Sequence, residues 1–362
     1  MPRRTPDRVA IWEPDPDGHR MVYVRILLDR CRVLGHSALL LTSLAAAHDS
    51  QTALHLPADV EVSPCDVRTP SESVKAAVHH GASLLVIPSG DDKLLGLLLS
   101  RLPVPTTTLM MARPEWTRSG PFSRARGRRA AKTLVVRMLG LKRNVRILSL
   151  APSAPLERLG QMEVADPVLI NRPVHWYHAH RSDFRAARSM ASEMTWIGLV
   201  GGVSDHKNPQ LVMRAVLRAG EHTSQRLGFA ILGPISPNVA SQVRDMAEIL
   251  RAARIPVIID ATRRSNETIN EDVAALDILV CAYSSHSPNS TTAKAHYLGT
   301  KVVGAGSAEF LSNGNAFWTA VSSSLTPSDL SNALYVACSE SPPRPSSPPP
   351  QEEFADRLLG RR

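Results

Sequence analysis

Residues 194–219 read MTWIGLVGGVSDHKNPQLVMRAVLRA, and this stretch decides the fold class. Its first part, 194–200, is an apolar run typical of a buried strand, and it ends at the turn-forming pair Gly201-Gly202. Pro209, a residue type favoured in the first turn of a helix, opens a helical pattern that continues to Ala219. A strand, a glycine turn and a helix in this order predict one unit of a parallel α/β sheet.

The same alternation of short apolar runs and helical stretches extends to both sides of this unit. At 362 residues the chain is about twice the usual length of a domain, so we expect two sheets with separate cores. The predicted strands are 8–12, 37–41, 60–63, 84–88, 106–111, 145–150, 194–200, 227–232, 256–259, 278–282 and 301–304, and the predicted helices are 18–34, 209–219, 240–253 and 290–298.

Composition predicts where the domains divide. A polar, irregular stretch at 176–192 is interpreted as a linker between an N-terminal domain, 1–175, and a C-terminal domain, 193–338. The remaining segment, 339–362, contains ESPPRPSSPPPQEE, and proline at this density blocks the hydrogen bonds of helices and sheets. We therefore expect a flexible Pro-rich tail, in which Phe354 to Leu359 has the composition of a short docked helix.

Cysteine spacing and hydropathy indicate the compartment. Cys31, Cys65, Cys281 and Cys338 are scattered, without the spacing of a zinc site or a disulfide framework. The N-terminal apolar stretch covers only 9–12, too short for a signal peptide, and no run approaches the roughly 20 apolar residues of a membrane span. We expect a cytoplasmic protein with no metal site.

The net charge of +9 comes from one segment. Residues 117–146 contain ten Lys and Arg and no Asp or Glu, which leaves 42 − 10 = 32 basic against 33 acidic residues elsewhere. An apolar block, 134–141, lies inside this segment. Two interpretations stay open: a helix that contacts an anionic membrane surface peripherally, or a core helix with solvated charges. Nucleic acid is disfavoured, because aromatic residues are few and no recognition motif is present.

Two loops are candidates for binding phosphate. The Gly201-Gly202 turn and the following Lys207 could offer main-chain N–H groups and a positive charge, although a tight turn alone would also explain the glycines. Ser290 and Thr291 begin a predicted helix, where their hydroxyl groups could bind a ligand or cap the helix. Both loops follow strands of one predicted sheet, and ligands of such sheets bind at that edge.

Three stretches of the second half resemble a known family in order and spacing: IGLVGGVSDHKNPQLVMRAV at 197–216, GFAILGPIS at 228–236, and LDILVCAYSSHSPNSTTAKAHYLGTKVVGAGSAEF at 276–310. GHRMVYVRILLDRCRVLGHSALLLT at 18–42 adds a similar opening turn and helix. Together they resemble the retaining GT-B glycosyltransferases, the large family called group one or family four. The resemblance implies an α/β fold of two Rossmann-like doubly wound domains that face each other across a cleft.

The resemblance also implies roles for individual residues. Gly201, Gly202 and Lys207 correspond to the donor diphosphate site, and Gly233 to the glycine that closes the next strand. Asn289, Ser290 and Thr291 correspond to groups that hold the phosphates. Gly18 and His19 correspond to the first-domain turn at the cleft, and His19 is our candidate for a catalytic residue near the acceptor.

One departure from the family concerns its two glutamates, of which the second binds the donor ribose. The corresponding positions here are His286 and Lys294, and neither side chain is a carboxylate acceptor. Asp15-Pro16-Asp17 matches a metal-binding pattern of another glycosyltransferase fold, but it reads as ordinary turn chemistry.

The expected function is transfer of a sugar from a nucleotide-diphosphate sugar, a co-substrate rather than a cofactor, to a glycan, lipid or small-molecule acceptor. By the resemblance, the reaction retains anomeric configuration and needs no metal. The alternatives are a catalytically degenerate GT-B-like protein that serves as a binding or partner subunit, and a nucleotide-sugar epimerase of similar architecture.

Overall fold

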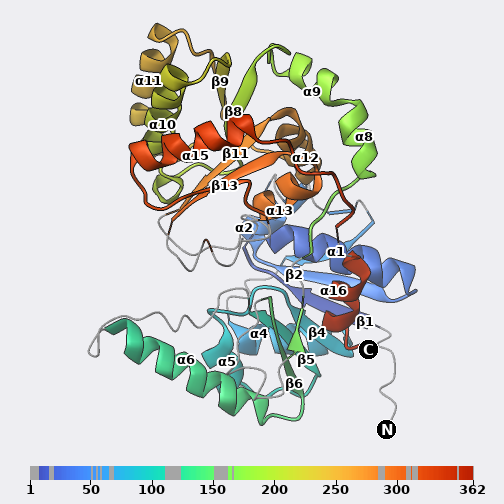
Figure 1. Cartoon of the computed structure of the whole chain (residues 1–362). Helices are drawn as coiled ribbons and strands as arrows, with labels where there is room; N and C mark the ends of the chain where they lie inside the picture. The colour runs from blue at the N-terminus through green and yellow to red at the C-terminus, as the bar shows by residue number, and fades with distance from the viewer. Residues whose placement is uncertain are drawn as a thin grey trace. The chain divides into compact units, whose positions relative to one another are not determined.

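The computed structural model describes residues 8–15, 20–49, 52–53, 56–57, 59–64, 69–110, 124–150, 162–164, 167–283, 290–306, 311, 317–348 and 350–361, with no side chains described at 124–130 and 162–163. The chain forms two compact units (Figure 1): Met1–Pro167 together with Pro349–Arg362, and Val168–Pro348. In the described part of the chain, no helix has both the length and the apolar character needed to cross a membrane.

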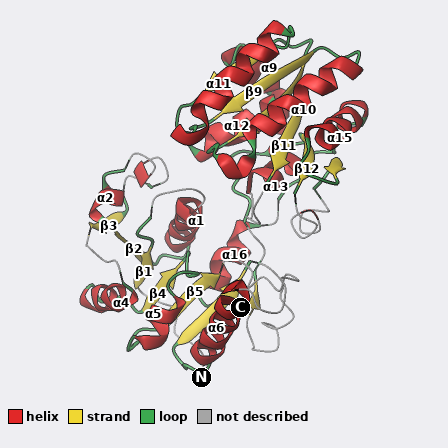
Figure 2. Ribbon diagram, turned by 90° about the vertical axis from the view of Figure 1, so that its left-hand side faces the viewer, coloured by secondary structure: helices red, strands yellow, loops and turns green. Residues whose placement is uncertain are grey.

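The first unit is built on a seven-stranded parallel sheet in the order β3-β2-β1-β4-β5-β6-β7. Helices α4, α5 and α6 cover one face, and α1 lies on the other (Figure 2). The strands are β1 (Arg8–Trp12), β2 (Ser37–Thr42), β3 (Glu61–Pro64), β4 (Leu84–Ile87), β5 (Thr106–Met110), β6 (Val145–Ser149) and β7 (Met162–Glu163). The helices are α1 (Arg20–Val33), α2 (Leu44–Ala47), α4 (Pro70–His79), α5 (Leu94–Leu99), α6 (Arg124–Gly140) and α16 (Gln351–Leu358).

The second unit has a six-stranded parallel sheet in the order β10-β9-β8-β11-β12-β13. Alternate residues of its strands pack on α10, α11 and α15 on one face and on α8, α9, α12 and α13 on the other. The strands are β8 (Thr195–Val200), β9 (Leu227–Leu232), β10 (Val257–Asp260), β11 (Ile278–Ala282), β12 (Lys301–Ala305) and β13 (Ala320–Ser322). The helices are α8 (Val174–Ala179), α9 (Arg181–Ala187), the 3-10 turn η1 (Asp205–Lys207), α10 (Pro209–His222), α11 (Pro237–Ala252), α12 (Asn266–Ala275), α13 (Ser290–Tyr297) and α15 (Pro327–Ser339).

In both sheets the strand order reverses beside the first strand of the unit. The chain adds strands on one side of β1 and then crosses to β4, and it does the same between β8 and β11. Such switch points open the crevice in which α/β proteins bind ligands, at the carboxyl ends of the strands. Each unit therefore has one favoured edge position for a site.

The predicted linker at 176–192 differs from the structure, which places α8 and α9 there as part of the second unit. Tyr177 and Phe184 are buried in the core of that unit. Arg181 and Arg185 both bind the Asp277 carboxylate, at 2.8 and 2.6 Å. The segment looked irregular because its few buried residues are spaced two helical turns apart among polar ones.

The predicted tail at 339–362 also differs from the structure. Residues 341–348 form neither helix nor strand, and the Ser346 N–H donates to the Tyr297 carbonyl at 3.1 Å. The chain then returns to the first unit as α16, where the Phe354 and Tyr23 rings lie 5.2 Å apart and Asp356 accepts two hydrogen bonds from Arg30. Proline prevents a helix before 350, but the amphipathic residues after it form the docked helix whose composition the sequence indicated.

Candidate functional site

The candidate site lies at the switch point of the second unit, where β8 and β11 run parallel as neighbours. The glycine bend follows β8, and α13 begins a few residues after β11. The Asn208 side-chain amide donates to the Ala282 carbonyl at 3.0 Å and so ties the loop after β8 to the end of β11. The structure thus brings the two loops singled out in the sequence to adjacent strand ends.

Gly201 and Gly233 serve the packing of this edge. Gly201 has a φ of +78°, and its N–H donates to the Leu232 carbonyl at 2.9 Å. Gly233 has a φ of +138°, and a Cβ there would lie 2.6 Å from the Gly201 carbonyl oxygen. Both glycines are therefore required by the backbone itself. Gly202 is different, because it is exposed and a Cβ there would meet nothing within 4 Å.

Lys207 lies directly beneath this bend. It is the last residue of η1, its side chain is buried, and its ammonium group donates to the Val200 carbonyl at 2.7 Å. The ammonium nitrogen is 3.7 Å from the Cβ position of Gly201. Burial lowers the pKa of Lys207 to about 8, which still leaves the side chain charged at neutral pH. Among the described residues no carboxylate pairs with it.

His206 and Tyr283 form a stacked pair that the sequence did not reveal. Their rings lie 5.8 Å apart at an angle of 17°, and the His206 Nδ1 is 2.6 Å from the Ser204 hydroxyl oxygen. Burial, followed by the charge of Lys207, lowers the pKa of His206. His206 lies beside Lys207 in the segment after β8, and Tyr283 follows the adjacent strand β11. The pair therefore connects the ends of these two strands. The only sequence signal is that each residue stands shortly after a buried strand.

The hydroxyl residues of α13 lie at the neighbouring strand end. Thr291 and Thr292 are buried, Ser290 is half-buried, and the Thr292 hydroxyl is 3.2 Å from the Cys281 sulfur. His286 and Asn289, the other predicted site residues of this loop, lie outside the described residues. So do Gly18 and His19 of the first unit.

Lys294 occupies an interior position between α12 and α13. Its ammonium group donates to the side-chain oxygens of Asn266 and of Asn270, the latter at 2.8 Å. The amide groups of these two asparagines donate in turn to the Leu169 carbonyl and to the Asn171 side-chain oxygen. Burial lowers the pKa of Lys294 to about 7. Lys294, for which the resemblance implied a ribose-binding position, is thus hydrogen-bonded to protein groups one turn inside α13.

The first unit holds a buried carboxyl group at its own switch point. Glu13 follows β1, is fully buried, and accepts a hydrogen bond from the Asp15 N–H at 3.2 Å. Its Oε1 is 3.8 Å from Arg20, while its Oε2 has no hydrogen-bond partner among the described residues. Burial raises the pKa of Glu13 to about 7, against the opposing charges of Lys93 and Arg20. Nothing in the sequence singled out Glu13, which stands just before Asp15-Pro16-Asp17, the segment interpreted as a turn.

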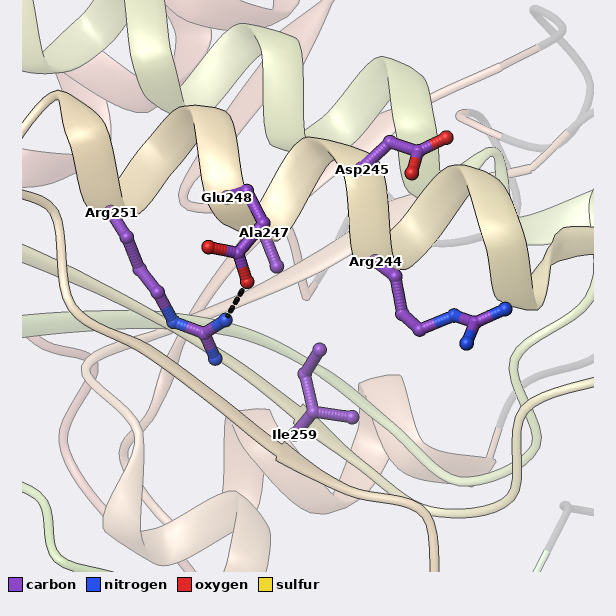
Figure 3. A pocket seen from close by; sticks show the side chains of 6 residues that line it. All are labelled: Arg244, Asp245, Ala247, Glu248, Arg251 and Ile259. Atoms are coloured by element: carbon purple, nitrogen blue, oxygen red, sulfur yellow. Dashed lines mark hydrogen bonds and ion pairs between the residues drawn. The ribbon is translucent and has the colours of Figure 1, made fainter.

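A pocket elsewhere in the second unit does not resemble a binding site. It lies between α11 and β10 and is lined by Ile259, Ala247 and a row of charged residues of α11 (Figure 3). Two of these, Arg251 and Glu248, pair with each other at 2.6 Å. Ile259 lies within β10 rather than beyond its end, so the pocket is separate from the switch point.

Two parallel-sheet units with Rossmann-like switch points define the GT-B architecture, and the predicted fold class is confirmed. The structure is similar to HepE from Anabaena in complex with UDP and glucose, with a TM-score of 0.63 at 12% identity over 98% of this chain and 94% of that one.

Two further solved structures are similar over nearly the whole chain. WaaG, a glycosyltransferase involved in lipopolysaccharide biosynthesis, has a TM-score of 0.62 at 13% identity over 97% of this chain and 94% of its own. A putative UDP-N-acetylglucosamine 2-epimerase from Listeria monocytogenes has a TM-score of 0.57 at 9% identity over 98% and 90%. No protein-family model and no curated protein sequence matches the chain. At these identities the similarity establishes the fold, and the chemistry has to be argued from the site.

Proposed function

We propose that the protein is a glycosyltransferase that binds a nucleoside-diphosphate sugar at the carboxyl edge of its second sheet. One observation carries the proposal: the buried ammonium group of Lys207, held on the Val200 carbonyl beneath the Gly201-Gly202 bend. No described carboxylate neutralises this charge, and the exposed Gly202 N–H lies in the same bend. A fixed positive charge beside an open main-chain N–H complements a diphosphate.

The proposed chemistry follows from the charge that such a reaction develops. The bond between the anomeric carbon and the diphosphate oxygen breaks as the oxygen of the acceptor hydroxyl bonds to that carbon. The diphosphate leaves with added negative charge, and the proton of the hydroxyl is released to solvent. Lys207 would stabilise this charge through a preorganised contact. Retention of configuration and independence from metal ions remain part of the proposal by the family resemblance.

The remaining site residues enter the proposal from the sequence. Ser290, Thr291 and Asn289 are proposed to contact the donor phosphates, and His286 and Lys294 stand at the two glutamate positions. Gly18 and His19 are proposed to face the acceptor, a glycan, a lipid or a small molecule. We place the activity in the cytoplasm.

One observation favours a second candidate, a GT-B-like protein that binds a nucleotide sugar without turning it over. Lys294 replaces a carboxylate with a side chain that is already engaged by Asn266 and Asn270. A donor ribose would then lack the acceptor group that the family provides. Such a protein would serve as a binding or partner subunit.

The test combines binding with turnover. Isothermal titration with UDP, GDP, UDP-glucose and UDP-N-acetylglucosamine is expected to give saturable binding to the full chain, with K207M weakened. Binding of none of these nucleotides would contradict the proposal. Mass spectrometry of reactions with donor alone and with added glycan or lipid acceptors then separates the alternatives. Sugar transfer supports the transferase, a new sugar isomer from donor alone indicates an epimerase, and binding without turnover indicates the degenerate form.

A further inference from the structure

The two most exposed large apolar side chains of the described residues lie at the ends of α5 and α6. Leu141, directly after α6, is 83% exposed, and Leu99, the last residue of α5, is 79% exposed. Leu95 on α5 and Leu134 and Met138 on α6 are also exposed. Exposed apolar residues are ordinary when single, but a group of them on adjacent helices marks a contact surface.

The packing of α6 on the core keeps its outer apolar residues exposed. Val136 and Leu139 of α6 are buried in the core of the first unit. The exposed residues Leu134, Met138 and Leu141 follow helical spacing on the opposite face. The helix is further held by the ion pair of Lys132 with Asp91 at 2.7 Å. This outward face is therefore a fixed feature of a packed helix.

Lys142 joins the two helices. Its ammonium group donates to the carbonyl oxygens of Leu97, Leu98 and Ser100, at 3.1, 2.5 and 2.8 Å. The end of α5 is therefore held one lysine side chain away from Leu141, and α5 lies beside α6 (Figure 1). Leu99 and Leu141 thus belong to one surface.

Unpaired positive charges border this surface. Arg101 follows the end of α5, Arg137 lies between Leu134 and Met138 on the outward side of α6, and Arg143 follows Leu141. All three are exposed, and no described carboxylate pairs with them. The segment 117–146 as a whole contains ten basic residues and no acidic one. Apolar side chains bordered by arginine match the boundary between anionic headgroups and acyl chains.

We propose that this α5–α6 surface, formed by Leu95, Leu99, Leu134, Met138 and Leu141 with Arg101, Arg137 and Arg143, docks the protein on anionic lipid bilayers. The leucines and the methionine insert at the level of the headgroups, and the arginines bind lipid phosphates. The contact involves no nucleotide, so it stands or falls independently of sugar transfer.

Vesicle sedimentation of the full chain tests this proposal without any nucleotide. Wild type is expected to bind phosphatidylcholine vesicles that contain phosphatidylglycerol, to bind pure phosphatidylcholine vesicles poorly, and to dissociate at high salt. L134Q/M138Q/L141Q, which leaves the charge unchanged, is expected to weaken binding about tenfold or more. R137Q/R143Q is expected to weaken it by about fivefold per residue.

Control variants make the same kinds of substitution outside the α5–α6 surface. V33Q replaces an exposed valine at the end of α1, and R214Q/R218Q removes two exposed arginines from α10. Both are expected to bind vesicles like wild type, and unfolding midpoints check that every variant is folded. Absence of wild-type binding at low salt would overturn the proposal, as would an equal loss in R214Q/R218Q. A wild-type dimer that L134Q/M138Q/L141Q makes monomeric, without vesicle binding, would show a self-association surface and would also overturn it.

Discussion

Gly233 packs backbone to backbone against Gly201, so closely that a Cβ on Gly233 would lie 2.6 Å from the Gly201 carbonyl oxygen. The contact joins the ends of β9 and β8 immediately beneath the candidate site. Gly202, the next residue of the bend, has open space around it. Adjacent glycines of one motif thus have different physical roles, and substitution can separate them.

G233A is expected to lower the free energy of unfolding by about 2 kcal/mol or more, because the methyl group both clashes with backbone and forces a strained φ. G202A is expected to change it by less than about 1 kcal/mol. Urea unfolding followed by circular dichroism measures both. Equal stability of the two variants would show that the strand ends relax freely, contrary to the packing described.

K207M is expected to weaken UDP binding by about 10- to 100-fold, the value of one charge-assisted hydrogen bond, when measured by isothermal titration. The substitution removes a charge whose burial costs about 3 kcal/mol, judged from the pKa lowered to about 8, and it loses the bond to the Val200 carbonyl. Stability should therefore change little. Wild-type affinity should also fall as the pH rises through about 8, because the ammonium group loses its proton.

Lys301 offers a matched control for this experiment. It is a buried lysine at the opposite, amino end of β12, and its ammonium group donates to the Glu340 carbonyl at 2.9 Å. K301M should leave the affinity for UDP unchanged. If K301M and K207M weakened binding equally, the effect would come from general loosening of the unit rather than from the charge beneath the bend.

Glu13 should make the first unit less stable as the pH rises. Its pKa is raised from 4.5 to about 7, so between these values the folded chain binds a proton that the unfolded chain releases. The stabilisation is complete below pH 4.5 and is lost as the pH approaches about 7, a change of about 3 kcal/mol. Lys93, Arg20 and Asp15 face the same carboxyl group. The charges of Lys93 and Arg20 and the Asp15 N–H lower the pKa of Glu13, whereas the charge of Asp15 raises it.

E13Q removes the titrating group and should flatten this slope relative to wild type in urea unfolding at a series of pH values. E221Q, which changes an exposed glutamate of α10, should keep the wild-type slope. A parallel pH dependence of wild type and E13Q would show that the pKa of Glu13 is the same in the folded and unfolded chains.

Most strands could be predicted from sequence because they are largely apolar runs, as in β4 and β9. The short strands β7 and β13 were not predicted. Every predicted strand is present, with ends that differ by at most one residue. The predictions did not include α4, α5 and α15, nor α8, α9 and α12. The last three bury few apolar residues among many polar ones, and α12 even buries Asn266, Asn270 and Asp272.

The partners of individual side chains could not be predicted in the same way. Sequence places Lys207 after a glycine bend and Lys294 in a helix, but both pairings depend on which strands and helices become neighbours. Nothing local to Lys294 indicates that Asn266, 28 residues earlier, accepts its hydrogen bond. Likewise, Glu13 is buried only because β1 is central in its sheet.

Lys294 should stabilise the packing of α12 against α13 through its hydrogen bonds, and K294M tests this. The substitution leaves two buried asparagine oxygens without their donor. At about pH 10, where the buried amine is neutral in the fold and its charge no longer opposes folding, we expect a loss of about 1–3 kcal/mol in the free energy of unfolding; UDP affinity should change less than about threefold. If Lys294 contacted the donor instead, K294M would weaken UDP binding while stability stayed constant. Calorimetric titration and urea unfolding of the same preparations distinguish the two results.

The pH dependence of the free energy of unfolding gives a second, independent test of this role of Lys294. The pKa of Lys294 is lowered by burial from 10.5 to about 7, so above about 7 the folded chain releases a proton that the unfolded chain still binds. Stability relative to K294M should therefore rise with pH above about 7, by up to about 1.4 kcal/mol per pH unit, and show no such rise below it. A neutral amine still donates to the asparagine oxygens, so the hydrogen bonds survive this change. Wild type and K294M of equal slope above pH 7 would mean that the amine stays protonated in the fold, with its charge compensated by groups other than Asn266 and Asn270.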